Sequence, residues 1–155
     1  MGSRMFRCAL LAMAAVLSPF RVGAASAQVS LHQGFEVANL TEFQSFWAHF
    51  RQAVMNDDIA AIEALTVFPL KTKGQLDDDP VKAIGKRAFA PLLRSHLKED
   101  PNMRGFSGNT LDFLRANPVF PRIDVDGSGD QNVGNLVFRR QTNGWKLSMI
   151  YRADD

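Results

Sequence analysis

The segment DVDGSGDQNVGN, residues 124–135, carries oxygen-bearing side chains at intervals that suit a calcium-binding loop. If Asp124 is position 1 of an EF-hand loop, the side chains at positions 1, 3, 5 and 7 are Asp124, Asp126, Ser128 and Asp130. Position 12 is Asn135 in place of the bidentate glutamate on which calcium affinity depends. The pattern therefore predicts, at most, a weak calcium site.

The same segment has a second interpretation as a loop that joins two strands. Its flanks, VFPRIDV and NLVFRRQ, have the composition of strands and not of the helices that brace an EF-hand. Gly127, Gly129 and Gly134 can adopt positive φ, and aspartate side chains accept hydrogen bonds from turn amides. This interpretation needs no cofactor, and we favour it over the calcium site.

Proton-transfer chemistry requires an acid or a base inside a pocket. The candidates are His49 on the first predicted helix, Arg139 in a predicted strand and Tyr151 in the last predicted strand. No aspartate or glutamate is expected on the inward face of that helix or of a strand. His96 has no His or Cys partner at metal-ligand spacing, so we predict that it is a surface or boundary residue. These patterns favour a non-catalytic protein.

The first 27 residues have the features of a secretory signal peptide. Arg4 and Arg7 precede the apolar run CALLAMAAVL, and the sequence ASA at 25–27 fits the small-residue cleavage rule. The apolar run is too short to span a bilayer. We therefore expect a periplasmic or secreted protein that is cleaved after Ala27, with one domain over residues 28–155 and no membrane attachment after cleavage.

Composition limits the partners of the mature chain. Removal of the signal segment removes Arg4, Arg7 and Arg21, which leaves 15 basic and 16 acidic residues. A domain with this balance has no basic stripe for phosphates, so nucleic acid is not expected as a partner. The single cysteine, Cys8, leaves with the signal segment, so an apolar core must hold the domain together without disulfides.

Helical periodicity dominates the first part of the mature chain. One apolar stripe of a helix is formed by Phe43, Phe46, Trp47, Phe50 and Val54. Thr41 and Gln44 fit a capping box, which predicts that this helix begins there. Asp57 is placed to cap a second, shorter helix, which would form a helical hairpin with the first.

The chain then changes period. Residues 66–74 are predicted to form a strand in which Pro69 indicates an edge position or a bulge. The acidic run at 77–79 is predicted to be a solvated loop. A third helix is predicted after Gly85, with Phe89, Leu92, Leu93 and Leu97 on its apolar face, and Asn109 can cap one or two further turns.

The remainder is predicted to be β-structure, in segments 119–125, 135–141 and 145–152, with a hairpin turn at 142–144. In the last strand, alternation predicts one apolar face made of Trp145, Leu147, Met149 and Tyr151. The opposite face would carry Lys146, Ser148, Ile150 and Arg152.

This order of elements resembles the nuclear transport factor 2-like superfamily. The segments FWAHFRQAVMNDDIAAIEALTVFPLKTKG, DDDP, RAFAPLL and GWKLSMIY are similar to a group of small exported bacterial proteins of that superfamily. The resemblance implies an α+β cone-shaped roll in which about three main helices pack on a curved, mostly antiparallel β-sheet. Members of the superfamily often have a pocket inside the cone.

The resemblance leaves three kinds of function open. The one we favour is non-catalytic binding, either of a small apolar or amphipathic ligand in the cone or of a protein partner on the outer sheet face, where a homodimer could also form. The pocket would be bordered by Trp47, His49, Phe50, Phe138 and Tyr151. The alternatives are an enzyme of the ketosteroid isomerase or polyketide cyclase type, acting by proton transfer, and a weak calcium-binding protein. A hollow cone would indicate a ligand, and a filled cone with an exposed apolar sheet face would indicate a protein partner.

Overall fold

The computed structural model describes residues 25–120 and 129–152, with side chains from residue 40 onward. The chain forms two compact units, Met1–Gly34 and Phe35–Asp155, and the packing described below belongs to the second. Residues 1–24 of the predicted signal segment lie outside the described residues. Three of the four candidate calcium ligands, Asp124, Asp126 and Ser128, also lie outside them.

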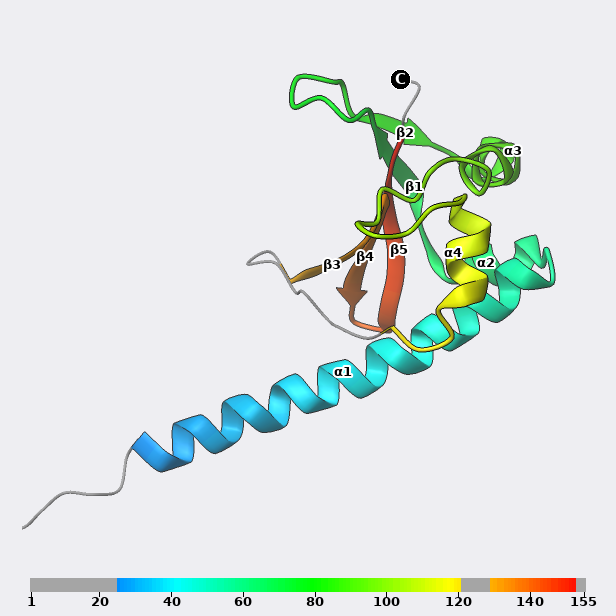
Figure 1. The fold of residues 1–155 in the computed structure, drawn as a ribbon. Coiled ribbons are helices and arrows are strands. Elements are labelled where there is room, and N and C mark those ends of the chain that lie inside the picture. Colours follow the sequence, from blue (N-terminus) through cyan, green and yellow to red (C-terminus); the bar gives the residue numbers. More distant parts are fainter. Residues whose placement is uncertain (1–24, 121–128, 153–155) are drawn as a thin grey trace, which may run out of the picture. The chain divides into compact units, whose positions relative to one another are not determined.

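The fold is α+β, as the sequence predicts (Figure 1). The described residues form four helices: α1 (Ala25–Met55), α2 (Ile59–Ala64), α3 (Lys86–His96) and α4 (Thr110–Ala116). They form five strands: β1 (Thr66–Lys73), β2 (Lys82–Ile84), β3 (Asp130–Val133), β4 (Leu136–Gln141) and β5 (Gly144–Tyr151). The helices pack on a mixed sheet that does not close into a barrel.

The sheet has the strand order β2-β1-β5-β4-β3. Three of its four pairings are antiparallel, and the pairing of β1 with β5 is parallel. Tight hairpins join β3 to β4 and β4 to β5, which confirms the predicted turn at 142–144. In this strand order β1 and β5, the first and last described strands, lie side by side near the middle of the sheet. Because three of the four pairings are antiparallel, the expectation of a mostly antiparallel sheet is confirmed.

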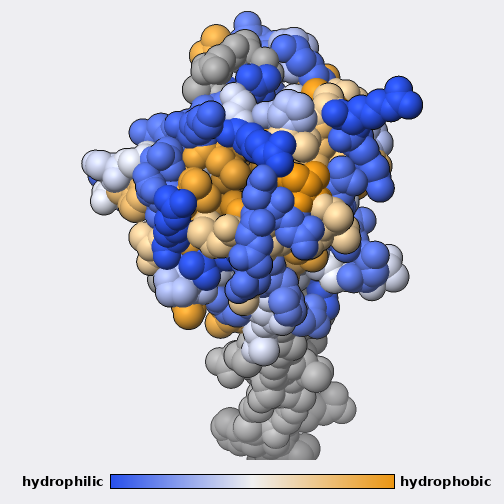
Figure 2. All heavy atoms as spheres, turned by 90° about the vertical axis from the view of Figure 1, so that its right-hand side faces the viewer, coloured by the Kyte–Doolittle hydropathy of each residue, from blue (hydrophilic) through white to orange (hydrophobic). Residues whose placement is uncertain are grey.

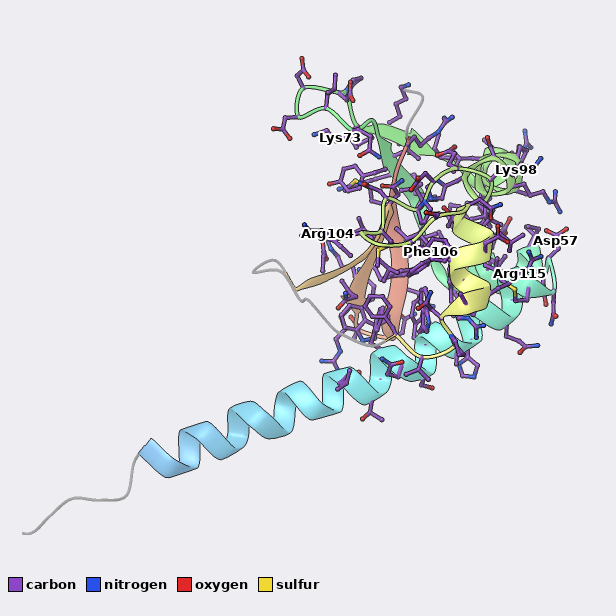
Figure 3. All side chains as sticks on the ribbon, in the orientation of Figure 1. Asp57, Lys73, Lys98, Arg104, Phe106 and Arg115 are labelled. Atoms are coloured by element: carbon purple, nitrogen blue, oxygen red, sulfur yellow. The ribbon has the colours of Figure 1, made fainter. Side chains whose placement is uncertain are left out.

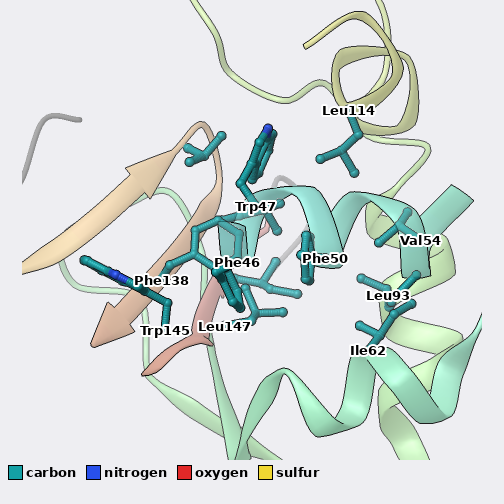
Figure 4. Packing of buried hydrophobic residues seen from close by; sticks show 14 of the residues in the cluster. Phe46, Trp47, Phe50, Val54, Ile62, Leu93, Leu114, Phe138, Trp145 and Leu147 are labelled. Carbon is teal, nitrogen blue, oxygen red and sulfur yellow. The ribbon is translucent and has the colours of Figure 1, made fainter. Parts of the chain in front are cut away.

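The aromatic stripe of α1 packs on the sheet (Figure 4). Phe43, Trp47 and Phe50 are completely buried, and Phe46 and Val54 are nearly so. The ring centroid of Phe43 lies 5.0 Å from that of Trp145 on β5, and the centroid of Phe46 lies 5.3 Å from that of Phe138 on β4. Edge-to-face ring pairs of this kind add about 0.5–1.5 kcal/mol each to the effect of burial.

Two predicted helix caps are wrong. α1 continues through Thr41 and Gln44, so these residues do not form a capping box; the side chain of Gln44 instead accepts a hydrogen bond from the backbone N–H of Phe120 and donates one to its carbonyl. Asp58, and not Asp57, caps α2, because its Oδ1 accepts from the N–H of Ala61 at 3.0 Å. Asn109 caps α4 as predicted, with its Oδ1 2.9 Å from the N–H of Asp112.

Asp57 instead occupies the turn between α1 and α2, where it has a positive φ of 50° (Figure 3). Its carboxylate accepts two hydrogen bonds from the guanidinium of Arg94 on α3, at 3.1 and 2.8 Å. These bonds to Arg94 lower the pKa of Asp57 below its ordinary value. The residue therefore links the turn to α3 and leaves the capping of α2 to its neighbour.

Pro69 lies at a bulge and not at a sheet edge. β1 has β2 on one side and β5 on the other, and its register with β5 shifts between Thr66 and Lys71. Proline lacks the N–H that a regular ladder uses, so it fits where the ladder is interrupted. Of the two alternatives that the sequence left open, the bulge is correct.

The predicted alternation of β5 fails after Leu147. Leu147 pairs with Phe138 and Met149 pairs with Val137, so β5 has one extra residue between these pairs. This bulge reverses the alternation, because side chains point to opposite faces at successive positions. Ile150 is therefore completely buried with Trp145 and Leu147, whereas Met149 and Tyr151 are only half-buried.

The predicted strand at 119–125 lies mostly outside the described residues. Its two described residues, Val119 and Phe120, are not in a strand. Phe120 instead belongs to the core, where its ring lies 5.7 Å from Trp47 between centroids.

Candidate functional site

An open groove of about 880 Å³ lies between α1 and the β4–β5 hairpin. On the helix side it is lined by Glu42, Ser45, Phe46 and His49, which recur at intervals of three and four residues. They therefore occupy one face of α1, beside the aromatic stripe that packs on the sheet. The exposed members of this face are polar, whereas Phe46 is nearly buried.

The other wall of the groove comes from the hairpin and from the end of α2. Gln141, Thr142 and Asn143 form an exposed amide and hydroxyl rim at the turn. Trp145 and Leu65 contribute apolar surface below this rim. The indole Nε1 of Trp145 is buried and has no hydrogen-bond partner among the residues that the structure describes. The groove thus combines an apolar floor with polar walls.

The charges at the groove are partly paired. Glu42 on α1 and Arg140 on β4 form an ion pair, with the Nη2 of Arg140 2.7 Å from the Oε2 of Glu42. The Nζ of Lys146 donates to the carbonyl of Ala64, the last residue of α2, at 2.6 Å. Because that partner is an uncharged oxygen, the Lys146 ammonium is not neutralised by it.

The five predicted pocket residues do not border a common pocket, because three of them pack against one another in the core. Trp47, Phe50 and Phe138 are completely buried in the aromatic cluster, and none of them lines this groove or the two further hollows described below. The Nε1 of Trp47 donates to the carbonyl of Asn117 at 3.0 Å, beyond the end of α4. Of the five predicted residues, His49 is the one that lines the groove.

Tyr151 lies on the opposite side of the sheet from this cluster. It pairs with Lys73 of β1, and the bulge in β5 turns its side chain away from the face that packs against α1. Its backbone N–H donates to the carbonyl of Asn135 at 2.9 Å. Tyr151 was predicted to border the pocket because regular alternation along the last strand was assumed, and the bulge in β5 interrupts that alternation.

The outer sheet face contains a third hollow, of about 370 Å³. Its apolar lining consists of Val67, Pro69, Val81, Val137 and Met149. Asp130 and Arg139 both line it and form a bidentate ion pair, in which the Nε and Nη2 of Arg139 donate to the two carboxylate oxygens at 2.7 and 2.5 Å. Asp130 is thus the one candidate calcium ligand among the described residues, and an arginine holds its carboxylate.

The sequence analysis did not predict the hydrogen-bonded pair that His96 forms with Glu99. His96 was predicted to lie at the surface or boundary, but its side chain is completely buried at the end of α3, with Nδ1 3.0 Å from the Oε2 of Glu99. Burial lowers the pKa of His96, while the hydrogen bond to Glu99 and the charge of Glu99 oppose this shift. The helical stripe that includes Phe89 and Leu93 gave a usable signal, because position 96 follows Leu93 by three residues.

The helical face of the molecule also exposes apolar surface. Figure 2 shows the side of α2, α3 and α4, where hydrophobic side chains gather near the middle and hydrophilic ones surround them.

The described residues contain no group of three or more His, Cys, Asp and Glu side chains that could hold a metal ion. The helices within residues 25–120 and 129–152 also include no segment with the length and hydropathy of a membrane span.

Comparison of this chain with protein families, with curated proteins and with solved structures finds no match.

Proposed function

We propose that this chain is an exported, non-catalytic binding domain that holds a small amphipathic ligand in the groove between α1 and the β4–β5 hairpin. The observation that carries the proposal is the composition of this groove: Phe46, Leu65 and Trp145 supply apolar surface, and Ser45, His49 and the hairpin turn supply hydrogen-bonding groups. Ligand sites in proteins combine an apolar lining with a few polar groups in this way.

The proposal moves the ligand from the interior to the edge of the fold. The interior between α1 and the sheet is packed with rings, since Trp47, Phe50 and Phe138 are completely buried and lie within about 6.4 Å of one another between centroids. A ligand there would have to displace this cluster. The groove is open without any such change.

Membership of the nuclear transport factor 2-like superfamily, and with it a cone shape, is part of the proposal. Its support is the order of the elements: a long first helix packed on the sheet, a short second helix, a strand, a third helix, and a final strand placed beside the first. The export proposal, to the periplasm or the medium, is supported by the sequence of residues 1–27 alone.

A dye-binding measurement tests the groove. Nile red, an uncharged apolar dye, should bind the mature protein with a rise in fluorescence that saturates. Ser45→Trp places a large side chain in the groove and should abolish this rise. Ala48→Trp is the matched control, because Ala48 is exposed on the same helix but does not line the groove. Equal binding by both variants would contradict the proposal, and mass spectrometry of the natively purified protein would identify a retained ligand.

A protein partner on the outer sheet face is a second candidate function. The hollow lined by Val67, Pro69, Val81, Val137 and Met149 favours it, because these apolar side chains lie on the sheet face opposite the one that packs on α1. A second copy of the chain is the simplest occupant. Light scattering would detect a dimer, and Met149→Glu should convert it to a monomer.

The enzyme alternative would require His49 to act as the acid or base, because it is the imidazole that lines the groove. Its carboxylate neighbour in the groove, Glu42, is occupied by Arg140. Deuterium exchange next to the carbonyl of a ketone bound in the groove, lost in His49→Gln, would support catalysis over simple binding.

A further inference from the structure

A second hollow, of about 520 Å³, adjoins the groove at the β4–β5 hairpin. The two hollows share Gln141, Thr142, Asn143 and Lys146. Beyond these shared residues, the second hollow is lined by Ala64, Thr66 and Val67, where the chain passes from α2 into β1. The hairpin turn and Lys146 therefore form the border between the two hollows.

The two hollows differ in their lining. The larger one contains the nearly buried rings of Phe46 and Trp145 as well as Leu65. The smaller one has no aromatic residue in its lining, and its side chains apart from Ala64 and Val67 are hydroxyl, amide or ammonium groups. An elongated ligand could place an apolar part in the larger hollow and a polar part beside Lys146.

Lys146 gives this border a positive charge. Its ammonium donates to the carbonyl of Ala64 and has two further hydrogens to donate. Among the described residues no carboxylate forms an ion pair with it, whereas the other cation at the groove, Arg140, forms an ion pair with Glu42. A ligand with an anionic head group would therefore meet an uncompensated cation.

We propose that the ligand is an anionic amphiphile whose acidic head group is bound by Lys146 at the border of the two hollows and whose apolar part lies against Phe46, Leu65 and Trp145. This inference rests on the proposed binding function of the groove and adds the charge of the ligand to it. A fatty-acid-like carboxylate is the simplest compound of this class.

Calorimetry with three probes of equal chain length tests the proposal. Dodecanoate has an anionic head, dodecyl maltoside has a neutral head and dodecyltrimethylammonium has a cationic head. The mature protein should bind dodecanoate about three- to fivefold more tightly than dodecyl maltoside, which is the size of effect that one partly exposed charge pair gives. Dodecyltrimethylammonium should bind more weakly than either.

The role of Lys146 is tested by substitution. Lys146→Met keeps the length of the side chain and removes its charge, so the preference for dodecanoate over dodecyl maltoside should vanish. Lys146→Arg keeps the charge and should retain the preference, which also separates the loss of charge from the loss of the bond to Ala64. Lys71→Met is the matched control, because Lys71 is exposed on β1 and lines neither hollow.

The outcomes separate the two proposals. An unchanged preference in folded Lys146→Met would overturn the assignment of the head-group site, and so would equal affinity of the unmodified protein for all three probes. In both cases the probes would still bind, and the proposed binding function of the groove would be retained. If none of the three probes binds, both the head-group site and the binding function of the groove are contradicted.

Discussion

The imidazole of His96 and the carboxylate of Glu99 form a hydrogen-bonded pair in the interior, with 3.0 Å between Nδ1 and Oε2. The pair joins the end of α3 to the segment that leads to α4. The backbone carbonyl of Glu99 also accepts two hydrogen bonds from Thr110, one from its N–H at 2.8 Å and one from its hydroxyl at 3.0 Å. The pair thus stabilises the connection between two helices that cover the sheet.

We predict that stability falls as the pH falls below about 6.5, the ordinary pKa of histidine. Burial lowers the pKa of His96 in the folded state; the hydrogen bond and charge of Glu99 oppose the shift, and the charge of Arg152 adds to it. Between the lowered pKa and 6.5 the unfolded chain binds more protons than the folded chain, so the free energy of unfolding decreases with decreasing pH. Urea unfolding at several pH values between 5 and 8 measures this dependence.

His96→Gln keeps a polar side chain but removes the titration. It should flatten the pH dependence of the free energy of unfolding below pH 6.5, whatever its effect at pH 8. If the variant and the unmodified protein lose stability in parallel over this range, other groups are responsible.

Phe50→Ala should cost about 3–5 kcal/mol of the free energy of unfolding, because it empties a completely buried position that contacts Phe46, Trp47 and Phe138. His49→Ala, at the adjacent exposed position, should change stability by less than about 0.5 kcal/mol. Denaturant unfolding of both variants checks the comparison. Similar costs at the two positions would contradict the packing of α1 on the sheet.

Gly134→Ala should destabilise the protein more than Gly144→Ala. Both glycines have positive φ, of 59° and 101°, so an alanine is strained at either position. At Gly134, however, an added Cβ would lie 2.0 Å from the carbonyl oxygen of Pro101, whereas at Gly144 it would meet nothing within 4 Å. The Gly144 variant should lose about 1 kcal/mol and the Gly134 variant clearly more. Thermal unfolding compares them, and equal losses would mean that the contact with Pro101 is not tight.

Asp58→Ala should lower the free energy of unfolding by about 1 kcal/mol, since it removes the side chain that caps α2. Asp57→Asn should have a smaller effect, because its partner Arg94 and its own carboxylate are exposed. Chemical denaturation of the two variants distinguishes these neighbouring residues. A larger loss at Asp57 would restore the cap that the sequence predicted.

Calcium should produce no heat of binding up to millimolar concentration. The reason lies at Asp130, whose carboxylate is held by Arg139 through two short hydrogen bonds, so calcium would have to displace an arginine there. Titration calorimetry of the mature protein is the measurement. Saturable heat that disappears in Asp130→Asn would instead support a calcium site in residues 124–135.

Local sequence patterns were sufficient for the helices and for most strands of the described chain. The stripe of α1 was predicted residue by residue because each member faces the same way at helical spacing, and all five are buried. The strands at 66–73 and 136–151 followed from composition and from the turn at 142–144. In these cases burial of one face is a property of the segment itself.

The candidate site was predicted poorly because it depends on which segments meet. His49 was expected to border a cavity, and it lines the groove, but the opposite wall comes from a hairpin more than 90 residues away in the sequence. The pocket of Trp47, Phe50, Phe138 and Tyr151 failed for two physical reasons. Three of these side chains fill the interior, and a one-residue bulge turns the fourth to the other face.

The sequence by itself determined the α+β class, the apolar face of each main helix and the hairpin of the last two strands, because these depend on interactions between near neighbours. Tertiary structure decided the parallel pairing of β1 with β5, the burial of His96 beside Glu99 and the meeting of α1 with the hairpin around Lys146. Each of these joins residues whose contact depends on how the whole sheet is assembled. Helical spacing places His96 on the apolar face of α3, but its polar side-chain type does not indicate burial, because its partner Glu99 is brought beside it only by the folded chain.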